Sequence, residues 1–291
     1  MPNGMLVIDK PEGWTSHDVV AKCRRLLGER RIGHAGTLDP MATGVLPIFV
    51  GRATRAVEFA AEGGKEYLAG LRLGLVTDTQ DVTGTVLAQS PVTVSREDVE
   101  QILSRFRGDI MQIPPMYSAI KQGGKKLYEL ARAGKEVDRP PRPVTISVLE
   151  LVGQSAPEEV TLRVACSKGT YVRTLCHDIG QALGCGGCLR SLRRTRAAGF
   201  TLEGAVTLPA LEQAAGRGEA DKLLLPVDSF FSAFPSVTVE GRALFQARNG
   251  APFPCEAPDG RWRVYGPDGA FLLLGECQGG TMRTVKSFFE V

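Results

Sequence analysis

The chain has 291 residues, of which 43% are hydrophobic, and this is enough to fill a core in one large domain with a smaller one beside it. No apolar run approaches 18 residues and the N-terminus lacks the long apolar region of a signal peptide, so a cytoplasmic protein without a membrane segment is expected. Seven cysteines with a single CxxC pair, Cys185 and Cys188, indicate neither a disulfide framework nor a four-ligand zinc site. The net charge of +3 is small, so arguments about partners must be made segment by segment.

The first elements of the chain lead into a constrained loop. Residues 5–9 predict a short strand, and the apolar stripe that follows predicts a helix that Ser16 caps and Gly28 ends. Residues 33–47 then hold one carboxylate, Asp39, among glycines and prolines, and Pro40 keeps that aspartate out of the helical region. A rigid turn of this kind positions a catalytic group, but aspartate is also a common turn residue, and the loop alone favours the second interpretation.

The middle of the chain predicts a strand and a helix. Alternating apolar residues from 67 to 75 are typical of a strand with one buried face. Ser95 and Asp98 have the spacing of a capping box, and Gly108 ends the helix that follows.

Residues 113–143 are rich in proline, glycine and cations around a short helical pattern, and long irregular segments in compact domains are usually functional or disordered. Residues 117–147 carry seven cations and three acids, and residues 163–196 carry seven cations and one acid. Two such segments in a balanced chain suit a polyanion such as nucleic acid, although solvated charged faces explain the charge equally well.

The second half of the chain returns to strands. They are expected at 144–152 and 160–166, before a helix for which Thr170 is the expected cap and Arg173 lies in the first turn. A helical segment and a connector precede a β-rich tail that begins at Pro226. Because strands and helices are mixed without regular βαβ units, the predicted class is α+β.

Three common kinds of catalytic site have no motif in this sequence. No GxxxxGK[ST] run occurs, which excludes a phosphate-binding P-loop, and no HExxH or GxSxG run occurs either. The remaining candidate chemistry centres on a carboxylate.

The Asp39 loop resembles the active-site motif of the bacterial TruB-type tRNA pseudouridine synthases, and the resemblance covers nearly the whole chain. The further motifs that match are residues 10–16, 65–67, 169–175 and 192–194. Residues 114–119 and 125–128 resemble the RNA-clasping insertion of the family, expected at about 113–143, and residues 226–228 and 241–244 resemble, more weakly, a PUA-type RNA-binding domain. One departure is Cys188, where many relatives carry histidine.

The resemblance implies a catalytic domain at 1–225, with a mixed, mainly antiparallel sheet, and a PUA-like domain at 226–291. It implies conversion of the uridine at position 55, in the tRNA T loop, to pseudouridine by a monomeric enzyme that needs no cofactor, nucleotide or metal. The uracil must leave C1′, rotate and rejoin through C5, and flipping the base out of its stack costs about a few kcal/mol.

The resemblance also assigns roles to residues. Asp39 is expected either to attack C1′ of the ribose or to remove its C2′ proton, and both routes remain open; an aspartate is already anionic at neutral pH. Arg173 is expected to pair with Asp39 through its fork of donors, and Tyr67 to stack on the flipped base. Contacts with the RNA or the base are expected for His34, Tyr171, Leu192, Lys10, Lys65, Lys125, Lys126 and Arg193.

Two other functions stay open at this point. A non-catalytic RNA-binding or RNA-folding module would use the same basic segments, but it would not require Asp39, Tyr67 and Arg173 together. A related synthase acting on another RNA, such as a guide-directed substrate, is a weaker option, and its partner proteins are not visible in one chain.

Overall fold

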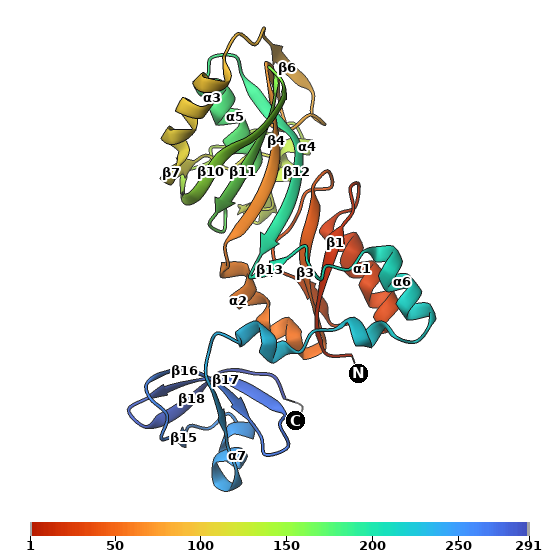
Figure 1. Ribbon diagram of the computed structural model, residues 1–291, viewed down its shortest axis with the longest axis vertical. Helices are drawn as coiled ribbons and strands as arrows, with labels where there is room; N and C mark the ends of the chain where they lie inside the picture. Colours follow the sequence, from red (N-terminus) through yellow and green to blue (C-terminus); the bar gives the residue numbers. More distant parts are fainter. Residues whose placement is uncertain (1, 290–291) are drawn as a thin grey trace.

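The computed structural model shows an elongated molecule built around a nine-stranded sheet (Figure 1). The structure describes residues 2–289. The strand order is β1-β3-β12-β4-β11-β10-β7, with β2 paired to β3 and β13 paired to β12. Among the strands of this sheet within residues 2–289, only β12 and β3 pair in parallel, so the predicted mixed, mainly antiparallel sheet is confirmed. The nine strands are β1 (Gly4–Lys10), β2 (Ile32–His34), β3 (Thr43–Val50), β4 (Lys65–Leu73), β7 (Gly108–Gln112), β10 (Arg142–Ala156), β11 (Glu159–Cys166), β12 (Gly187–Ala197) and β13 (Phe200–Thr201).

Helices cover this sheet in two groups. Helices α1 and α6 lie side by side next to β1, and α3 and α5 pack near the opposite end of the sheet (Figure 1). No helix within residues 2–289 is long and apolar enough to cross a membrane. The helices of this part are α1 (Ser16–Leu27), α2 (Val57–Glu62), α3 (Arg96–Leu103), α4 (Leu127–Arg132), α5 (Val172–Ala182) and α6 (Leu208–Gly216), with short 3₁₀ turns at Gly51–Ala56, Ser104–Phe106, Ala220–Leu223 and Val227–Phe231.

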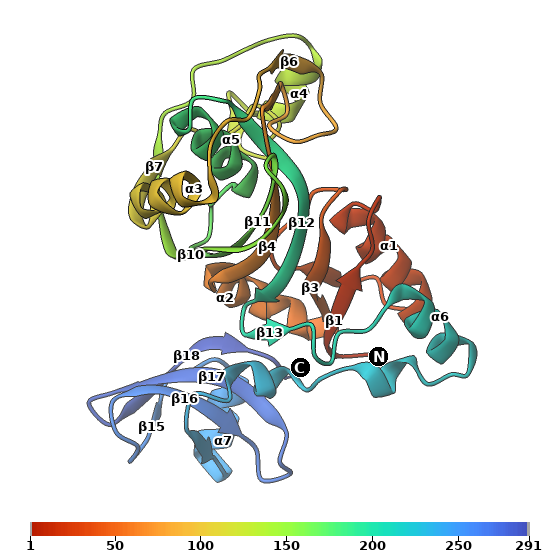
Figure 2. The same cartoon turned by 45° about the horizontal axis from the view of Figure 1, so that its top comes forward.

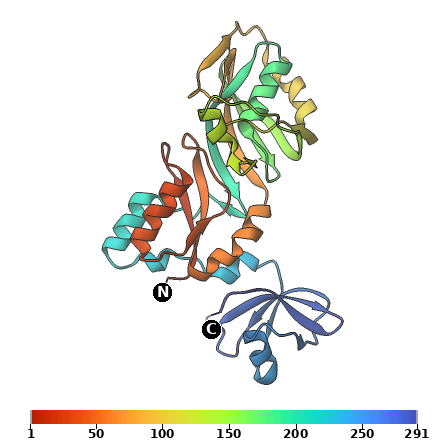
Figure 3. The ribbon, with the colours of Figure 1, turned by 180° about the vertical axis from the view of Figure 1, so that it is seen from behind.

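Two small hairpins extend from the sheet. One pairs β5 (Leu75–Thr77) with β6 (Val86–Gln89), and the other pairs β8 (Lys121–Gln122) with β9 (Lys125–Lys126). The second hairpin and α4 belong to the basic insertion. Figure 3, a view from behind, shows this yellow-green segment crossing in front of the sheet near α5.

The β-rich tail forms a second, five-stranded sheet with one helix, α7 (Gly241–Arg248), on one side of it (Figure 2). Phe231 and Phe288 join an apolar cluster with Phe49, so aromatic rings seal the contact between this part and the larger sheet. The boundary at residue 225 and the PUA-like type of this part remain predictions. Its strands, in sheet order, are β14 (Ser236–Thr238), β16 (Gly260–Tyr265), β17 (Phe271–Gln278), β18 (Thr281–Ser287) and β15 (Phe253–Pro254).

Helix ends follow local hydrogen bonding, and two predicted caps are wrong. Thr15, not Ser16, caps α1: its side chain accepts a hydrogen bond from the Asp18 N–H in a capping box. Helix α5 has no side-chain cap, because the Thr170 hydroxyl donates to the Ser167 carbonyl instead, at 3.0 Å. The capping box that begins at Ser95 is present as predicted.

Candidate active site

The structure brings Asp39 and Arg173 into contact. Arg173 lies in the first turn of α5, and its Nε is 2.9 Å from Asp39 Oδ2. The arginine side chain is only 6% exposed, whereas the aspartate side chain is 39% exposed. A buried guanidinium therefore holds a carboxylate that solvent, and hence a substrate, can reach.

Other donors of Arg173 are occupied by partners from separate segments. Nη1 donates to the Thr79 carbonyl at 3.1 Å, and Nη2 donates to the Tyr117 carbonyl at 2.8 Å. Nη1 also lies 3.9 Å from Oδ2 of Asp81, a carboxylate that is 8% exposed. These contacts fix the direction of the guanidinium plane, and the Tyr117 contact connects the basic insertion to the site.

Sequence reasoning missed Asp81. Its Oδ1 accepts hydrogen bonds from the Thr79 hydroxyl at 2.8 Å and from the Thr83 N–H at 3.0 Å, so the loop between β5 and β6 holds it firmly. The signal in the sequence was a group of threonines and aspartates at 77–83 after a predicted strand, and such groups are typical of ordinary turns.

The Asp39 turn depends on a close approach between β3 and β12. The Ala42 N–H donates to the Asp39 carbonyl at 3.0 Å, which closes the turn. Gly44 follows with a φ of 102°, and a Cβ there would lie 2.2 Å from the Arg194 carbonyl. Arg194 is fully buried and donates to the Val45 carbonyl at 2.7 Å and to the Gly36 carbonyl at 3.0 Å. Through Arg194, β12 thus holds both ends of the loop in place. The sequence did not indicate this role for Arg194.

Lys10 supports the same turn from β1, which differs from the expectation that it contacts RNA. It has no exposed surface, and its Nζ donates to the carbonyls of Pro11 at 2.8 Å, Trp14 at 2.7 Å and Pro40 at 3.2 Å. Burial lowers the pKa of this ammonium group to about 8. Ser16, expected to be a cap, also braces the loop, because its Oγ accepts a hydrogen bond from the N–H of Leu38 at 2.9 Å.

Two residues expected at the flipped base lie in the apolar cluster that includes Leu38 of the loop. Tyr67 is 6% exposed and Leu192 is 8% exposed, and burial raises the pKa of the Tyr67 hydroxyl. His34 lies on the other flank of the loop, where its ring meets that of His17 edge-on at 5.6 Å. Burial, and then the charges of His17 and Arg194, lower the pKa of His34 to about 4, so this imidazole is neutral at pH 7.

Three further expected residues have internal partners. Lys65 donates to the Gly63 carbonyl at 2.8 Å, and burial lowers its pKa. The Tyr171 N–H donates to the side chain of Gln112 at 3.0 Å, which fixes the start of α5. Arg193 pairs with Asp9 at 2.9 Å and keeps 41% of its side chain exposed.

The basic segment at 163–196 is not a free cationic surface, contrary to the expectation from its charge. Arg173 and Arg194 are buried, and most of its other cations have acidic partners. The pairs are Arg163 with Glu66 and Glu150, Lys168 with Glu62, Arg190 with Glu159, and Arg193 with Asp9. The sequence could not show this, because most of the partners come from other strands of the sheet.

The insertion, by contrast, keeps several of its lysines unpaired, although Arg139 pairs with Glu136 at 3.1 Å. Lys121, Lys125 and Lys135 are exposed, and none of them has an ion pair with any residue that the structure describes. Lys126 lies 5.3 Å from the centre of the Tyr128 ring and donates to the hydroxyl of that residue. The insertion therefore combines unpaired positive charge with an aromatic ring, as a nucleic-acid contact requires.

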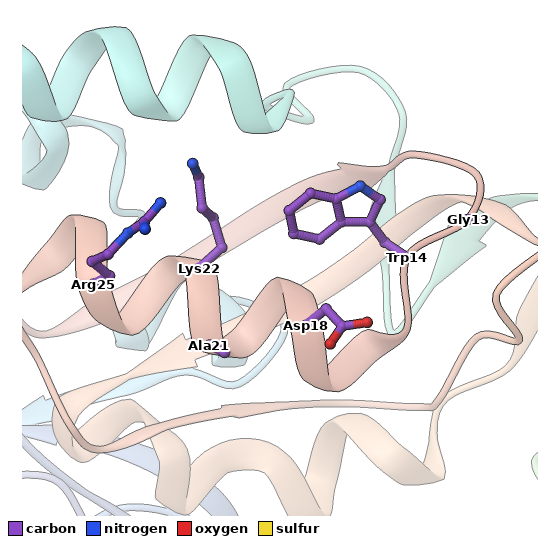
Figure 4. A pocket seen from close by; sticks show the side chains of 6 residues that line it. All are labelled: Gly13, Trp14, Asp18, Ala21, Lys22 and Arg25. Atoms are coloured by element: carbon purple, nitrogen blue, oxygen red, sulfur yellow. The ribbon is translucent and has the colours of Figure 1, made fainter.

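Two surface cavities adjoin this region without being lined by Asp39. One of about 220 Å³ lies beside the loop and is bordered by Met41, Thr43 and Leu192. The other, of about 500 Å³, lies over α1, where Trp14 and Lys22 point toward α6 (Figure 4). Lys22 pairs there with Glu212 at 2.7 Å, so this groove is bridged by an internal ion pair.

Comparison with known proteins gives consistent results over most of the chain. Residues 24–172 match the TruB family pseudouridylate synthase N-terminal domain, and residues 173–232 match the tRNA pseudouridylate synthase B C-terminal domain. The chain is 49% identical to tRNA pseudouridine synthase B of Azoarcus sp. (strain BH72), over 97% of this chain and 93% of that protein. It is 47% identical to tRNA pseudouridine synthase B of Pseudomonas aeruginosa (strain UCBPP-PA14), over 94% of this chain and 91% of the relative.

Solved structures show the same architecture. A Cbf5-Nop10-Gar1 complex contains a chain that matches with a TM-score of 0.74 and 28% identity, over 99% of this chain and 85% of that chain. A chain in the structure of an H/ACA RNP bound to a substrate RNA containing 2′-deoxyuridine matches with a TM-score of 0.74 and 25% identity. The match covers 99% of this chain and 86% of that chain.

Proposed function

The chain belongs to the TruB family of pseudouridylate synthases and isomerises uridine to pseudouridine in tRNA, and we propose that its target is the uridine at position 55 of the T loop. The observation that carries the proposed chemistry is the ion pair between Asp39 and Arg173, in which the carboxylate is accessible and the guanidinium is buried. A module that only binds RNA has no need for such a pair.

Asp39 is the group that acts on the ribose. The N1–C1′ bond of the target breaks, the uracil turns, and a C5–C1′ bond forms; the C5 proton is lost and N1 gains a proton, so the reaction is a net isomerisation. Asp39 either bonds to C1′ or takes the C2′ proton, and both routes begin with an ionised carboxylate. Arg173 orients that carboxylate by a charge-assisted hydrogen bond, and its two backbone contacts prevent it from turning away.

The flipped uracil binds against the small parts of Tyr67 and Leu192 that remain exposed, 6% and 8% of these residues, in the apolar cluster that includes Leu38 of the loop. The unpaired lysines of the insertion bind the RNA backbone, and the hydrogen bond from Arg173 to the Tyr117 carbonyl connects the insertion to the site. Neutral His34 occupies space at the loop without adding a charge.

A tritium-release assay tests the proposal. Wild-type protein should release tritium from C5-labelled uridine of a T stem-loop RNA without an added cofactor, and no release at stoichiometric enzyme would exclude the activity. Asp39→Asn should abolish release while RNA affinity stays within a few-fold of wild type. A large loss of affinity would instead assign Asp39 a structural role.

The T-loop target can be tested separately. A stem-loop in which only the uridine at position 55 is replaced by cytidine should bind normally and yield no product. Product formation at another uridine would show that the enzyme acts elsewhere in the RNA. The tRNA-modifying relatives are much more similar in sequence than the H/ACA proteins, which favours tRNA over a guide-directed substrate.

A further inference from the structure

Gln112 is a buried amide at the point where the basic insertion leaves the sheet. It is the last residue of β7 and is 1% exposed. Its partner across the strands is Arg142, where the chain returns from the insertion into β10. A buried amide costs free energy unless it is hydrogen-bonded, so its partners indicate what it does.

Both partners of the Gln112 side chain belong to the backbone of one residue, Tyr171. Gln112 Oε1 accepts a hydrogen bond from the Tyr171 N–H at 3.0 Å, and Nε2 donates to the Tyr171 carbonyl at 3.3 Å. Tyr171 immediately precedes α5, and α5 has no side-chain cap of its own. An amide from a distant strand therefore takes the place of a local cap and fixes the backbone where the helix begins.

The first turn of α5 also carries Arg173, two residues after Tyr171. Arg173 Nε lies 2.9 Å from Asp39 Oδ2, and its Nη2 donates to the carbonyl of Tyr117 in the insertion at 2.8 Å. The stem of the insertion thus meets this turn at two points, Gln112 and the Tyr117 carbonyl. A shift of the turn would move the origin of the Arg173 side chain, and an error of about 1 Å in positioning can slow a reaction about 100-fold.

We propose that Gln112 is a positioning residue for the isomerisation: it holds the Tyr171 backbone and so sets the place from which Arg173 directs Asp39. The inference rests on the proposed function, since it takes Asp39 as the group that acts on the ribose. Gln112 is too deeply buried to contact the RNA itself, so it acts through Arg173. It also connects the stem of the insertion to the turn that carries this arginine.

A role confined to the stability of β7 is a poorer explanation. The contact between β7 and β10 is made by backbone pairing and by apolar side chains such as Val144, which is 5% exposed and lies opposite Ile110. An apolar side chain at position 112 would serve that packing without an amide to satisfy. Two hydrogen bonds to the backbone of another element indicate that the amide orients that element.

The experiment compares Gln112→Met, which keeps the length of the side chain and removes both hydrogen bonds, with Val144→Ala. Gln112→Met should slow single-turnover tritium release at least about 10-fold, while the Kd for the T stem-loop stays within about threefold of wild type. Val144→Ala weakens the packing of the same strand pair without touching Tyr171, and its rate should stay within about twofold of wild type. Gln112→Asn, whose amide is one methylene shorter, should also slow the reaction and provides the test if the methionine variant does not fold.

A double-mutant cycle with Arg173→Lys separates positioning from stability. If Gln112 acts through Arg173, Gln112→Met should slow the Arg173→Lys enzyme by less than about twofold. An equal loss in both backgrounds would overturn the inference. The same holds for a folded Gln112→Met variant with the wild-type rate, for a Val144→Ala variant that is slowed equally, and for failure of both Gln112 variants to fold.

Wild-type protein that releases no tritium would reject the proposed function instead. The contact between Gln112 and α5 would still be judged by hydrogen exchange of the Tyr171 amide, which should be at least about 10-fold faster in Gln112→Met than in Val144→Ala. Equal exchange in the two variants would overturn the inference whatever the activity, so the two failures can be distinguished.

Discussion

Replacing Arg173 with lysine tests whether Asp39 needs only a positive charge beside it or also needs the arrangement of the guanidinium nitrogens. The variant keeps the charge, but it replaces three nitrogens with one. In the wild type those nitrogens contact Asp39, the Thr79 carbonyl and the Tyr117 carbonyl at 2.9, 3.1 and 2.8 Å. A single ammonium group cannot maintain all three contacts in these directions.

The size of the effect follows from which contacts the lysine keeps. A hydrogen bond to a charged group contributes about 1.5–3 kcal/mol, and an unpaired buried carbonyl costs about 1–3 kcal/mol. If the ammonium turns to the carbonyls, the lost orientation of Asp39 slows the reaction about 10- to 150-fold, since about 1.4 kcal/mol is a factor of ten. If it stays with Asp39, two carbonyls lose their donor and the free energy of unfolding falls by about 2 kcal/mol or more.

Single-turnover tritium release at saturating enzyme measures the first effect, and urea unfolding measures the second. We expect a rate about 100-fold below wild type and a Kd for tRNA within threefold, because the Arg173 side chain is only 6% exposed. Asp81→Asn, which removes the charge 3.9 Å away but keeps the shape, serves as the matched control and should slow the reaction less. A folded lysine variant with a rate within threefold of wild type and unchanged stability would refute the idea that donor geometry holds Asp39.

Three further predictions concern the surroundings of the site. Lys10→Met should slow single turnover at least about 10-fold with unchanged RNA affinity, since three carbonyls around the Asp39 turn lose their donor; a loss confined to affinity would restore Lys10 as an RNA contact. The lowered pKa of His34 means that the unfolded state binds its proton more tightly between pH 6.5 and about 4, so acidification over this range should destabilise the fold by up to about 3 kcal/mol. His34→Gln should flatten this part of the urea-unfolding profile, and an unchanged profile would contradict the burial argument. Replacing Lys121, Lys125 and Lys135 with alanine should reduce the slope of log affinity against log salt by about 2; an equal slope would show that the insertion does not contact phosphates.

The sequence alone determined the features that depend on neighbouring residues. The alternation along 67–75 predicted a strand, and the Ser95 capping box predicted a helix start, because both reflect periodicity or hydrogen bonds within a few residues. The mainly antiparallel sheet and the family followed from the order of several motifs, since their joint occurrence is far more specific than any one of them.

The tertiary structure decided what the charged side chains do. Lys10 and Arg194 were cations of unknown exposure in the sequence, and the fold buries both around the Asp39 loop. Arg163, Arg190 and Arg193 became ion-pair partners because the order of strands in the sheet places acids of other strands beside them. Asp81 lies 3.9 Å from Arg173, although the hairpin that carries Asp81 is far from Arg173 along the chain. Burial and charge pairing depend on which distant segments meet, and no local pattern of residues contains that information.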